Sequence, residues 1–315
     1  MSRLRRAAPL CARAARLLGW LATGLALGFV GWRLAGSDAW RIAGDHPERL
    51  ALTILLGALA YALASFLLAE AWRQLLGPSA TKAPARSYHA LYGRTQIAKY
   101  LPGNVLHFAG RQILGRELGH GQAALALASL LETLLLLLVA AILAVPLASR
   151  SLDAAWLRGG WMPAVGAVAL IAAGAGLWLA RSHAGLPVPK GWRRADGEAI
   201  RLEPYRLWRA ALLYAVFFAS AGGLLWMLTL TLDQGRPELG RLVICIEALA
   251  AAWAIGFVTP GASAGLGVRE AVLIMALQGE LGGQASTLVA LTMRLVTIGG
   301  DALFFALSLP SPGRP

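Results

Sequence analysis

The sequence has few of the residues that soluble enzymes depend on, and these absences narrow its function. Only 16 of its 315 residues are Asp or Glu. Charged residues make up 14% of the chain, whereas a soluble domain carries about 25%. The two cysteines, Cys11 and Cys245, fit neither a metal-ligand spacing nor a disulfide framework. The chain has no phosphate-binding loop with a Lys, no HExxH and no nucleophile elbow. We therefore expect no cofactor and no metal, and a transporter or membrane scaffold rather than a soluble-type enzyme.

The sequence is dominated by long runs of apolar residues. Hydrophobic residues make up 57% of the chain, and several runs reach the roughly 20 residues that a helix needs to cross a bilayer. We predict an all-α polytopic membrane protein that forms one domain over residues 1–315. It should have about seven spanning helices, within a range of six to eight. The predicted spans are 17–33, 50–70, 122–146, 161–180, 209–232, 241–258 and 285–309.

The basic residues are concentrated in particular loops, which argues for a membrane orientation signal rather than a nucleic-acid surface, despite the net charge of +13. The tail 1–16 carries five Arg and no acid, residues 71–120 carry seven basic residues against one Glu, and residues 181–209 carry seven more against three acids. The positive-inside rule places all three in the cytoplasm of an inner-membrane protein. The segment 181–208 is then a cytoplasmic loop between two halves. Seven spans put the C-terminus outside, and an eighth near 266–280 would put it inside.

Two Pro-Gly breaks adjoin apolar segments. The first lies in Lys99 to Asn104 (KYLPGN), and the second in Thr259 to Ala262 (TPGA). Broken backbone at membrane depth is tolerated only where protein or a watery cavity satisfies its polar groups, and a pair of breaks in two halves points to a transport site. Ordinary turns are the alternative. We predict re-entrant or broken helices at 88–115 and 259–280. Their predicted hinge residues are Pro102, Gly103, Pro260, Gly261, Gly265 and Gly267.

An ionisable residue inside a membrane span costs free energy to bury, so each one is a candidate functional residue. Those in the predicted spans are Glu132, Glu247, Arg294 and Asp301. Arg294 and Asp301 are seven residues apart, which is two turns along one helix face. We expect ion pairs that join Glu132, Glu247 or Glu270 to Arg111, Arg269 or Arg294. Purely structural ion pairs between helices are the alternative role.

The first break is followed by a cationic helix face. His107 and Arg111 are four residues apart and share a face of any helix that starts after Pro102. Free backbone N–H groups at that helix start add affinity for anions, so the face suits a phosphate or phosphodiester headgroup. Asn104 could cap the helix or line a cavity. The predicted substrate-binding residues are Lys99, Asn104, His107, Arg111, Arg269 and Glu270.

Together these motifs resemble the flippase-like, lysylphosphatidylglycerol synthase transmembrane-region family. The resemblance covers about residues 50–309 and rests on KYLPGN-x-x-H-x-x-GR, Ser129-x-x-Glu132, TPG-x-x-x-G-x-G-x-x-E and Arg294. It implies a lipid-translocating membrane domain with two re-entrant elements and without a soluble aminoacyl-transferase domain. Ala262 departs from the paired glycines usual in the second motif. The matching positions are Lys99, Pro102, Gly103, Asn104, Arg111, Glu132, Pro260, Gly261, Gly265, Gly267, Glu270 and Arg294.

The leading functional hypothesis is a transporter that moves an anionic or polyprenyl-linked lipid across or within the inner membrane. Its partner is a membrane lipid and not a nucleic acid. One alternative is an integral membrane lipid-modifying transferase that uses Glu132 or Glu270 as a base. Another is a non-catalytic scaffold that binds envelope-biosynthesis enzymes.

Overall fold

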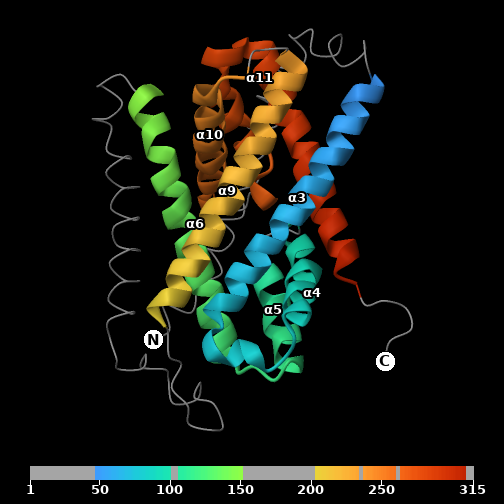
Figure 1. The fold of residues 1–315 in the computed structure, drawn as a ribbon, viewed down its shortest axis with the longest axis vertical. Coiled ribbons are helices and arrows are strands. Elements are labelled where there is room, and N and C mark those ends of the chain that lie inside the picture. The colour runs from blue at the N-terminus through green and yellow to red at the C-terminus, as the bar shows by residue number, and fades with distance from the viewer. Residues whose placement is uncertain (1–46, 101–105, 152–202, 234–236, 260–262, 310–315) are drawn as a thin grey trace, which may run out of the picture.

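The computed structural model describes residues 47–100, 106–151, 203–233, 237–259 and 263–309 (Figure 1). Within these ranges the chain forms seven α-helices and no strand. The helices are α3 (Pro47–Leu75), α4 (Ala85–Gln96), α5 (Leu106–Glu117), α6 (Gln122–Ser151), α9 (Pro204–Asp233), α10 (Leu239–Val258) and α11 (Val268–Leu307). Short 3-10 turns are η1 (Gly77–Thr81), η2 (Ile97–Tyr100) and η4 (Ser263–Gly265).

Five of these helices are long and apolar enough to cross a membrane. They are α3, α6, α9, α10 and α11. The prediction of an all-helical membrane protein is confirmed at this level. The predicted spans 17–33 and 161–180 lie outside the described residues, as do the tail 1–16 and most of the loop 181–208.

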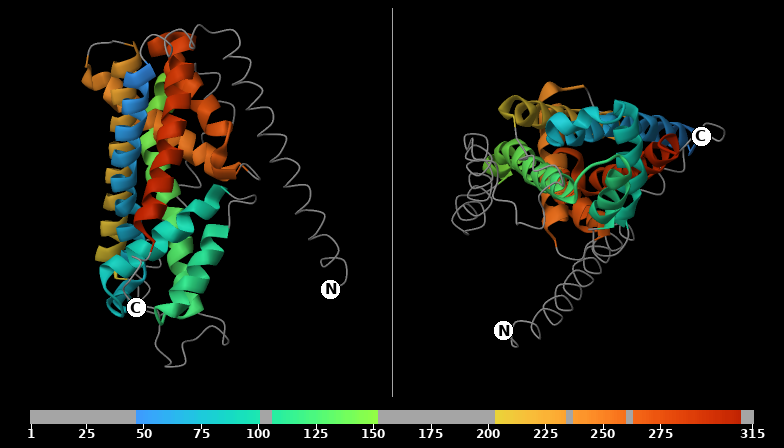
Figure 2. Two further views of the ribbon diagram at one scale, coloured as in Figure 1. Left: turned by 90° about the vertical axis from the view of Figure 1, so that its right-hand side faces the viewer. Right: turned by 90° about the horizontal axis from the view of Figure 1, so that it is seen from below.

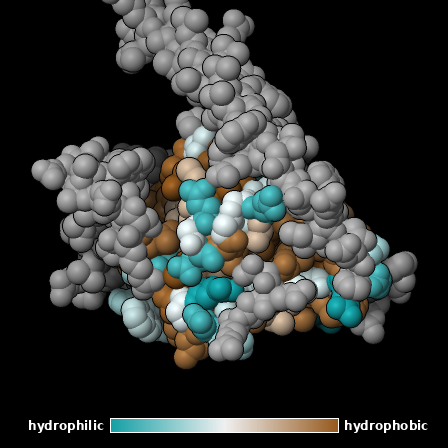
Figure 3. Space-filling view, turned by 90° about the horizontal axis from the view of Figure 1, so that it is seen from above, coloured by the Kyte–Doolittle hydropathy of each residue, from teal (hydrophilic) through white to brown (hydrophobic). Residues whose placement is uncertain are grey.

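The outer surface of the long helices is apolar, as expected where lipid is the solvent. On α3 alone, Leu52, Leu55 and Leu63 are each more than half exposed. A soluble protein rarely leaves so continuous an apolar face uncovered. Seen end-on from above, hydrophilic and apolar side chains mix on the end face (Figure 3).

Three long helices, α3, α9 and α11, run side by side along the molecule and pack against one another (Figures 1 and 2). Glycines make the closest approaches. A Cβ added at Gly300 of α11 would lie 2.9 Å from the Ala58 carbonyl oxygen, and one at Gly222 of α9 would lie 2.6 Å from the Ile246 Cα. Small residues at such crossings let helix backbones approach closely within a membrane.

The first predicted broken element is a hairpin of short helices. The helices α4 and α5 lie together at the lower end of the molecule in Figure 1, and η2 continues α4 toward the molecular centre. Two contacts join the residues near the start of α4 to those that follow α5. The Tyr88 hydroxyl lies 2.8 Å from His120 Nε2, and Lys82 Nζ donates to the Gly119 carbonyl at 2.9 Å.

The second predicted broken element follows α10. It turns through η4 into α11, whose regular geometry is interrupted at Gly282 (φ 76°, ψ 167°). The helix therefore has a short arm, 268–281, and a long arm, 283–307. The short arm ends close to the predicted boundary at residue 280. The start of α11 lies near mid-height above the α4–α5 hairpin (Figure 2, left), and η4 contacts η2. The two broken elements thus meet inside the bundle.

Because the α3–α11 crossing leaves no room for a side chain at Gly300, Gly300→Ala should destabilise the fold. The new Cβ would lie 2.7 Å from the Tyr61 ring and 2.9 Å from a backbone oxygen that cannot rotate away. Overpacking costs typically about 1–3 kcal/mol, more than the roughly 1 kcal/mol that Ala gains over Gly in a helix. We expect a lower melting temperature in detergent. Gly279→Ala, whose Cβ meets nothing within 4 Å, is the control and should melt no lower than wild type. Equal melting of the two variants would contradict the tight crossing.

Candidate functional site

Arg111 of α5 is buried in the hairpin region with its charge fully matched. Its side chain is 1% exposed and forms an ion pair with Glu132 of α6. A second guanidinium nitrogen donates to Gln96 Oε1 at 3.1 Å, and the Tyr92 hydroxyl donates to the other Glu132 oxygen at 2.6 Å. The guanidinium also lies 3.9 Å from the centre of the Tyr92 ring and 5.5 Å from that of Trp72. Both charges of the Arg111–Glu132 pair are therefore neutralised within the protein.

Lys99, at the tip of the first hairpin, is paired with the last described helix. Its Nζ lies 2.7 Å from Asp301 Oδ2, and the Tyr100 hydroxyl donates to the same oxygen at 2.6 Å. Asp301 is buried in the long arm of α11. This cluster joins the KYLPGN segment to a helix two hundred residues away in sequence.

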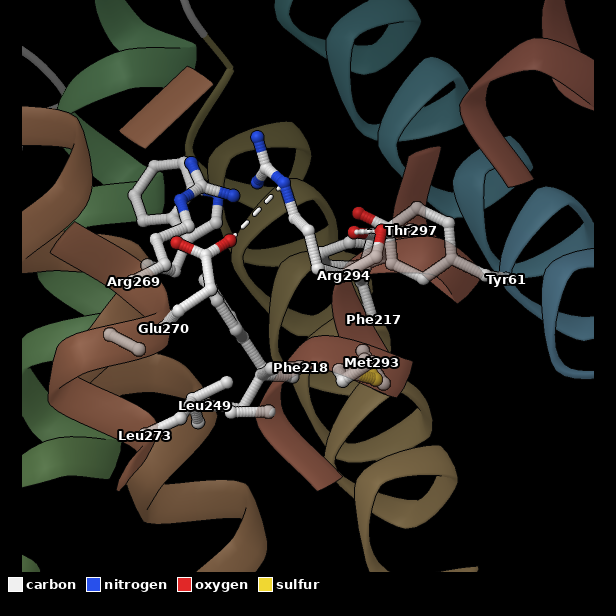
Figure 4. Close-up of a pocket in the computed structure, with 14 residues that line it drawn as sticks. Tyr61, Phe217, Phe218, Leu249, Arg269, Glu270, Leu273, Met293, Arg294 and Thr297 are labelled. Atoms are coloured by element: carbon white, nitrogen blue, oxygen red, sulfur yellow. Dashed lines mark hydrogen bonds and ion pairs between the residues drawn. The ribbon is translucent and has the colours of Figure 1, made fainter. Parts of the chain in front are cut away.

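The second broken element is held by the same helix arm. Arg294 Nε lies 3.2 Å from Glu270 Oε1, as the dashed line in Figure 4 shows. Arg294 also donates to the Ala264 carbonyl at 3.4 Å, and its guanidinium lies 5.6 Å from the centre of the Tyr100 ring. The predictions that Glu132 and Glu270 form ion pairs with Arg are thereby confirmed. Glu247 is buried in α10 and lines neither of the cavities described below.

Arg269 is the exception among these cations. Within the described residues it forms no ion pair, and its Nε has no hydrogen-bond partner. Its guanidinium lies 5.8 Å from the centre of the Trp253 ring. The Arg269 side chain packs against two glycines, where any larger residue would collide with it. A Cβ at Gly256 would lie 2.6 Å from Arg269 Cγ, and one at Gly265 would lie 2.7 Å from its Nε.

The charge of the site follows from these pairs. Its four cations are Lys99, Arg111, Arg269 and Arg294, and its three carboxylates are Glu132, Glu270 and Asp301. Four minus three leaves one positive charge, and the pairing assigns it to Arg269.

Two cavities meet at Arg269. The first is lined mainly by apolar groups, among them Phe217, Leu249 and Met293 (Figure 4). The second is lined by both polar and apolar groups. Phe217, Trp253 and Arg269 line both. The unpaired cation therefore lies where an apolar cavity and a cavity of mixed polarity adjoin.

His107 contributes a neutral polar group to the second cavity. It is 7% exposed, and its buried Nδ1 has no hydrogen-bond partner. Burial, followed by the nearby charges of Arg111 and Lys99, lowers the pKa of the imidazole to about 3. The ring is therefore uncharged at neutral pH. The cavity wall beyond it includes the stacked rings of Trp253 and Phe257, whose centres are 5.1 Å apart.

Most predicted site residues that the structure describes come together here. Those that line the second cavity are Lys99, His107, Arg111, Glu132 and Arg269. Those that line the first are Arg269, Glu270 and Arg294. Pro102, Gly103, Asn104, Pro260 and Gly261 lie outside the described residues.

The structure adds detail to the predicted glycine hinges and to the predicted binding cations. Gly265 and Gly267 have φ of 68° and 81°, a region that glycine enters without steric cost; the neighbouring Ala264 shares it at φ 50°. Three of the predicted substrate-binding residues are the cations Lys99, Arg111 and Arg269, and the first two are already bound to carboxylates. Arg269 alone of the three is left without one in the described structure.

Sequence reasoning missed the aromatic part of the site. Tyr92 and Tyr100 donate hydrogen bonds to the carboxylates of Glu132 and Asp301, and Phe217 of α9 lines both cavities. Tyr100 lies inside the KYLPGN motif, so its position in the sequence is a signal that could have marked it as a site residue. Phe217 lies in an uninterrupted apolar run, so no sequence signal marks it.

A scan against protein-family models and a search of curated proteins each found no match for this chain. Among the described residues, no group of three or more His, Cys, Asp and Glu side chains is placed to hold a metal ion.

The buried Arg111–Glu132 pair predicts a strong stability effect. Glu132→Gln would leave Arg111 buried without a counter-charge, and breaking a buried pair in this way costs roughly 3–5 kcal/mol. We expect a large fall in melting temperature in detergent, with partial recovery when Arg111→Gln is added. Glu117→Gln, at an exposed position of α5, is the matched control. A Glu132→Gln protein that melts like this control would show that the pair carries no structural role.

Proposed function

We propose that this protein is a lipid transporter of the inner membrane that moves an anionic lipid across or within the bilayer. One observation carries the proposal: an unneutralised Arg269 lies at the junction of two cavities, where two broken helical elements meet. The resemblance of both motifs to the flippase-like family supports the same function.

The charge of the site favours an anionic ligand. Arg269 is partly buried, and a partly buried cation is stabilised by a counter-charge. The guanidinium fork also matches phosphate oxygens in geometry. A phosphate bound at Arg269 would bring the net charge of the cluster from one positive charge to zero. A cationic ligand would raise it further. The lipid tails would stay in the bilayer along the apolar outer faces of the long helices.

The broken elements suit movement of such a headgroup. We infer that both are re-entrant, the α4–α5 hairpin from one side and the α10–α11 turn from the other. Irregular backbone at membrane depth then lines a cavity. Each element is tied by ion pairs to the long arm of α11. An anion that competes for Lys99 or Arg294 would loosen one element at a time, which is the alternation that transport needs.

The transferase alternative depends on a carboxylate that is free to act as a base. Both Glu132 oxygens are occupied, by Tyr92 and by Arg111. Glu270 keeps one buried oxygen, Oε2, without a partner. The alternative therefore rests on Glu270 alone. Conversion of a radiolabelled lipid by the purified protein, lost in Glu270→Gln, would favour it over transport.

Removal of the Arg269 charge should abolish transport. In proteoliposomes that contain a fluorescent anionic phospholipid, Arg269→Gln should lower the translocation rate at least about tenfold, because the headgroup loses its charge-assisted contact of roughly 1.5–3 kcal/mol. Arg116→Gln, at an exposed position of α5, should transport like wild type. Equal rates for Arg269→Gln and wild type would refute the proposed binding site.

Displacement of Arg269 without loss of its charge should also impair transport. The methyl group of Gly256→Ala would occupy the space of the Arg269 stem at 2.6 Å, so the guanidinium must leave its place between the cavities. We expect a several-fold lower translocation rate in the same assay. Gly223→Ala, where a Cβ meets nothing within 4 Å, is the control. The idea fails if the two glycine variants transport equally well.

A further inference from the structure

The second cavity contains groups that distinguish one lipid headgroup from another. Two of its lining cations are neutralised, Arg111 by Glu132 and Lys99 by Asp301 of α11. The remaining charge is that of Arg269. A phosphodiester with an uncharged headgroup supplies one negative charge and balances the site. A headgroup that carries its own ammonium would leave one positive charge unbalanced.

The polar atoms of this cavity that have no partner in the described structure match a hydroxyl. The Nδ1 of His107 and the Nε of Arg111 are buried and have no partner in the described structure. A neutral imidazole offers one donor and one acceptor nitrogen, and the Arg111 Nε–H is a donor. A hydroxyl can both accept from one group and donate to another. An ammonium only donates, so it could not accept from Arg111.

The aromatic rings argue against a quaternary ammonium headgroup. Such groups are recognised by open aromatic faces. In this cavity the rings of Tyr92 and Phe108 are approached by Arg111, at 3.9 and 5.8 Å from their centres. The ring of Trp253 is approached by Arg269. These three rings are therefore already in contact with cations. The two other phenylalanine rings of the lining pack on aromatic neighbours, Phe257 on Trp253 and Phe217 on Tyr61.

We propose that the site selects phospholipids whose headgroup is neutral and bears hydroxyl groups. The phosphate lies at Arg269 and the hydroxyls lie against His107 in the second cavity, while the lipid tails stay in the bilayer. This selectivity rests on the proposed function, because it assumes that the same cavities bind a lipid phosphate.

Equilibrium binding of short-chain lipids to the detergent-solubilised protein, followed by intrinsic Trp fluorescence, tests the headgroup selectivity separately from the proposed anionic-lipid site. Phosphatidylglycerol and phosphatidylethanol carry the same charge and differ in headgroup hydroxyls. Phosphatidylethanolamine and phosphatidylcholine add a cationic headgroup. We expect wild type to bind phosphatidylglycerol about tenfold more tightly than phosphatidylethanol, as one to two hydrogen bonds would give. Both zwitterionic lipids should bind more weakly still.

Variants assign the preference to its residues. His107→Leu should reduce the preference for phosphatidylglycerol over phosphatidylethanol to within about twofold, with a melting temperature in detergent that shows the variant to be folded. His107→Asn, which keeps a donor and an acceptor, should retain most of the preference. Arg269→Gln should weaken both lipids.

Each other outcome has a definite meaning. If wild type binds phosphatidylglycerol and phosphatidylethanol equally, or binds phosphatidylcholine as tightly, the headgroup selectivity is wrong while the anionic-lipid site stands. If no anionic lipid binds, or if Arg269→Gln binds them as wild type does, the proposed function itself is contradicted.

Discussion

Most of the charged side chains buried in the described bundle are paired within the protein, and one helix arm supplies the partners for both broken elements. Arg294 and Asp301 lie two turns apart on the long arm of α11. Arg294 binds Glu270 of the second element, and Asp301 binds Lys99 of the first. Because an unpaired buried charge costs several kcal/mol, these contacts fix the position of each element against the same helix.

The space left by this arrangement has a defined electrostatic character. Every carboxylate of the cluster is paired with another cation, so none is left to neutralise the charge of Arg269. Glycines at positions 256 and 265 give its stem a path between α10 and η4, and the positive φ values of Gly265 and Gly267 turn the chain there. Backbone conformation and side-chain charge thus place one guanidinium between an apolar cavity and a cavity of mixed polarity. Lipid headgroup binding follows from that position as a proposal, because phosphate complements both the charge and the geometry of guanidinium.

The sequence predicted the parts of this site whose signals are local. Pro-Gly breaks and the spacing of His107 and Arg111 mark the two elements, and charges inside apolar runs mark the candidates for ion pairs. Which carboxylate meets which cation depends on the tertiary packing, so the Lys99–Asp301 pair, 202 residues apart, was not predicted. The same limit applies to Arg269. Its charge is visible in the sequence, but its lack of a partner emerges only once Lys99, Arg111 and Arg294 have been assigned theirs. Phe217 was missed because a phenylalanine within an apolar helix resembles any lipid-facing residue.

The most direct test of this account is an experimental structure of the protein in lipid nanodiscs that contain an anionic phospholipid. The account predicts phosphate density within hydrogen-bonding distance of the Arg269 guanidinium, with the Glu132–Arg111 and Glu270–Arg294 pairs intact. A structure in which a protein carboxylate neutralises Arg269, and lipid density occurs only on the outer faces of the helices, would contradict it.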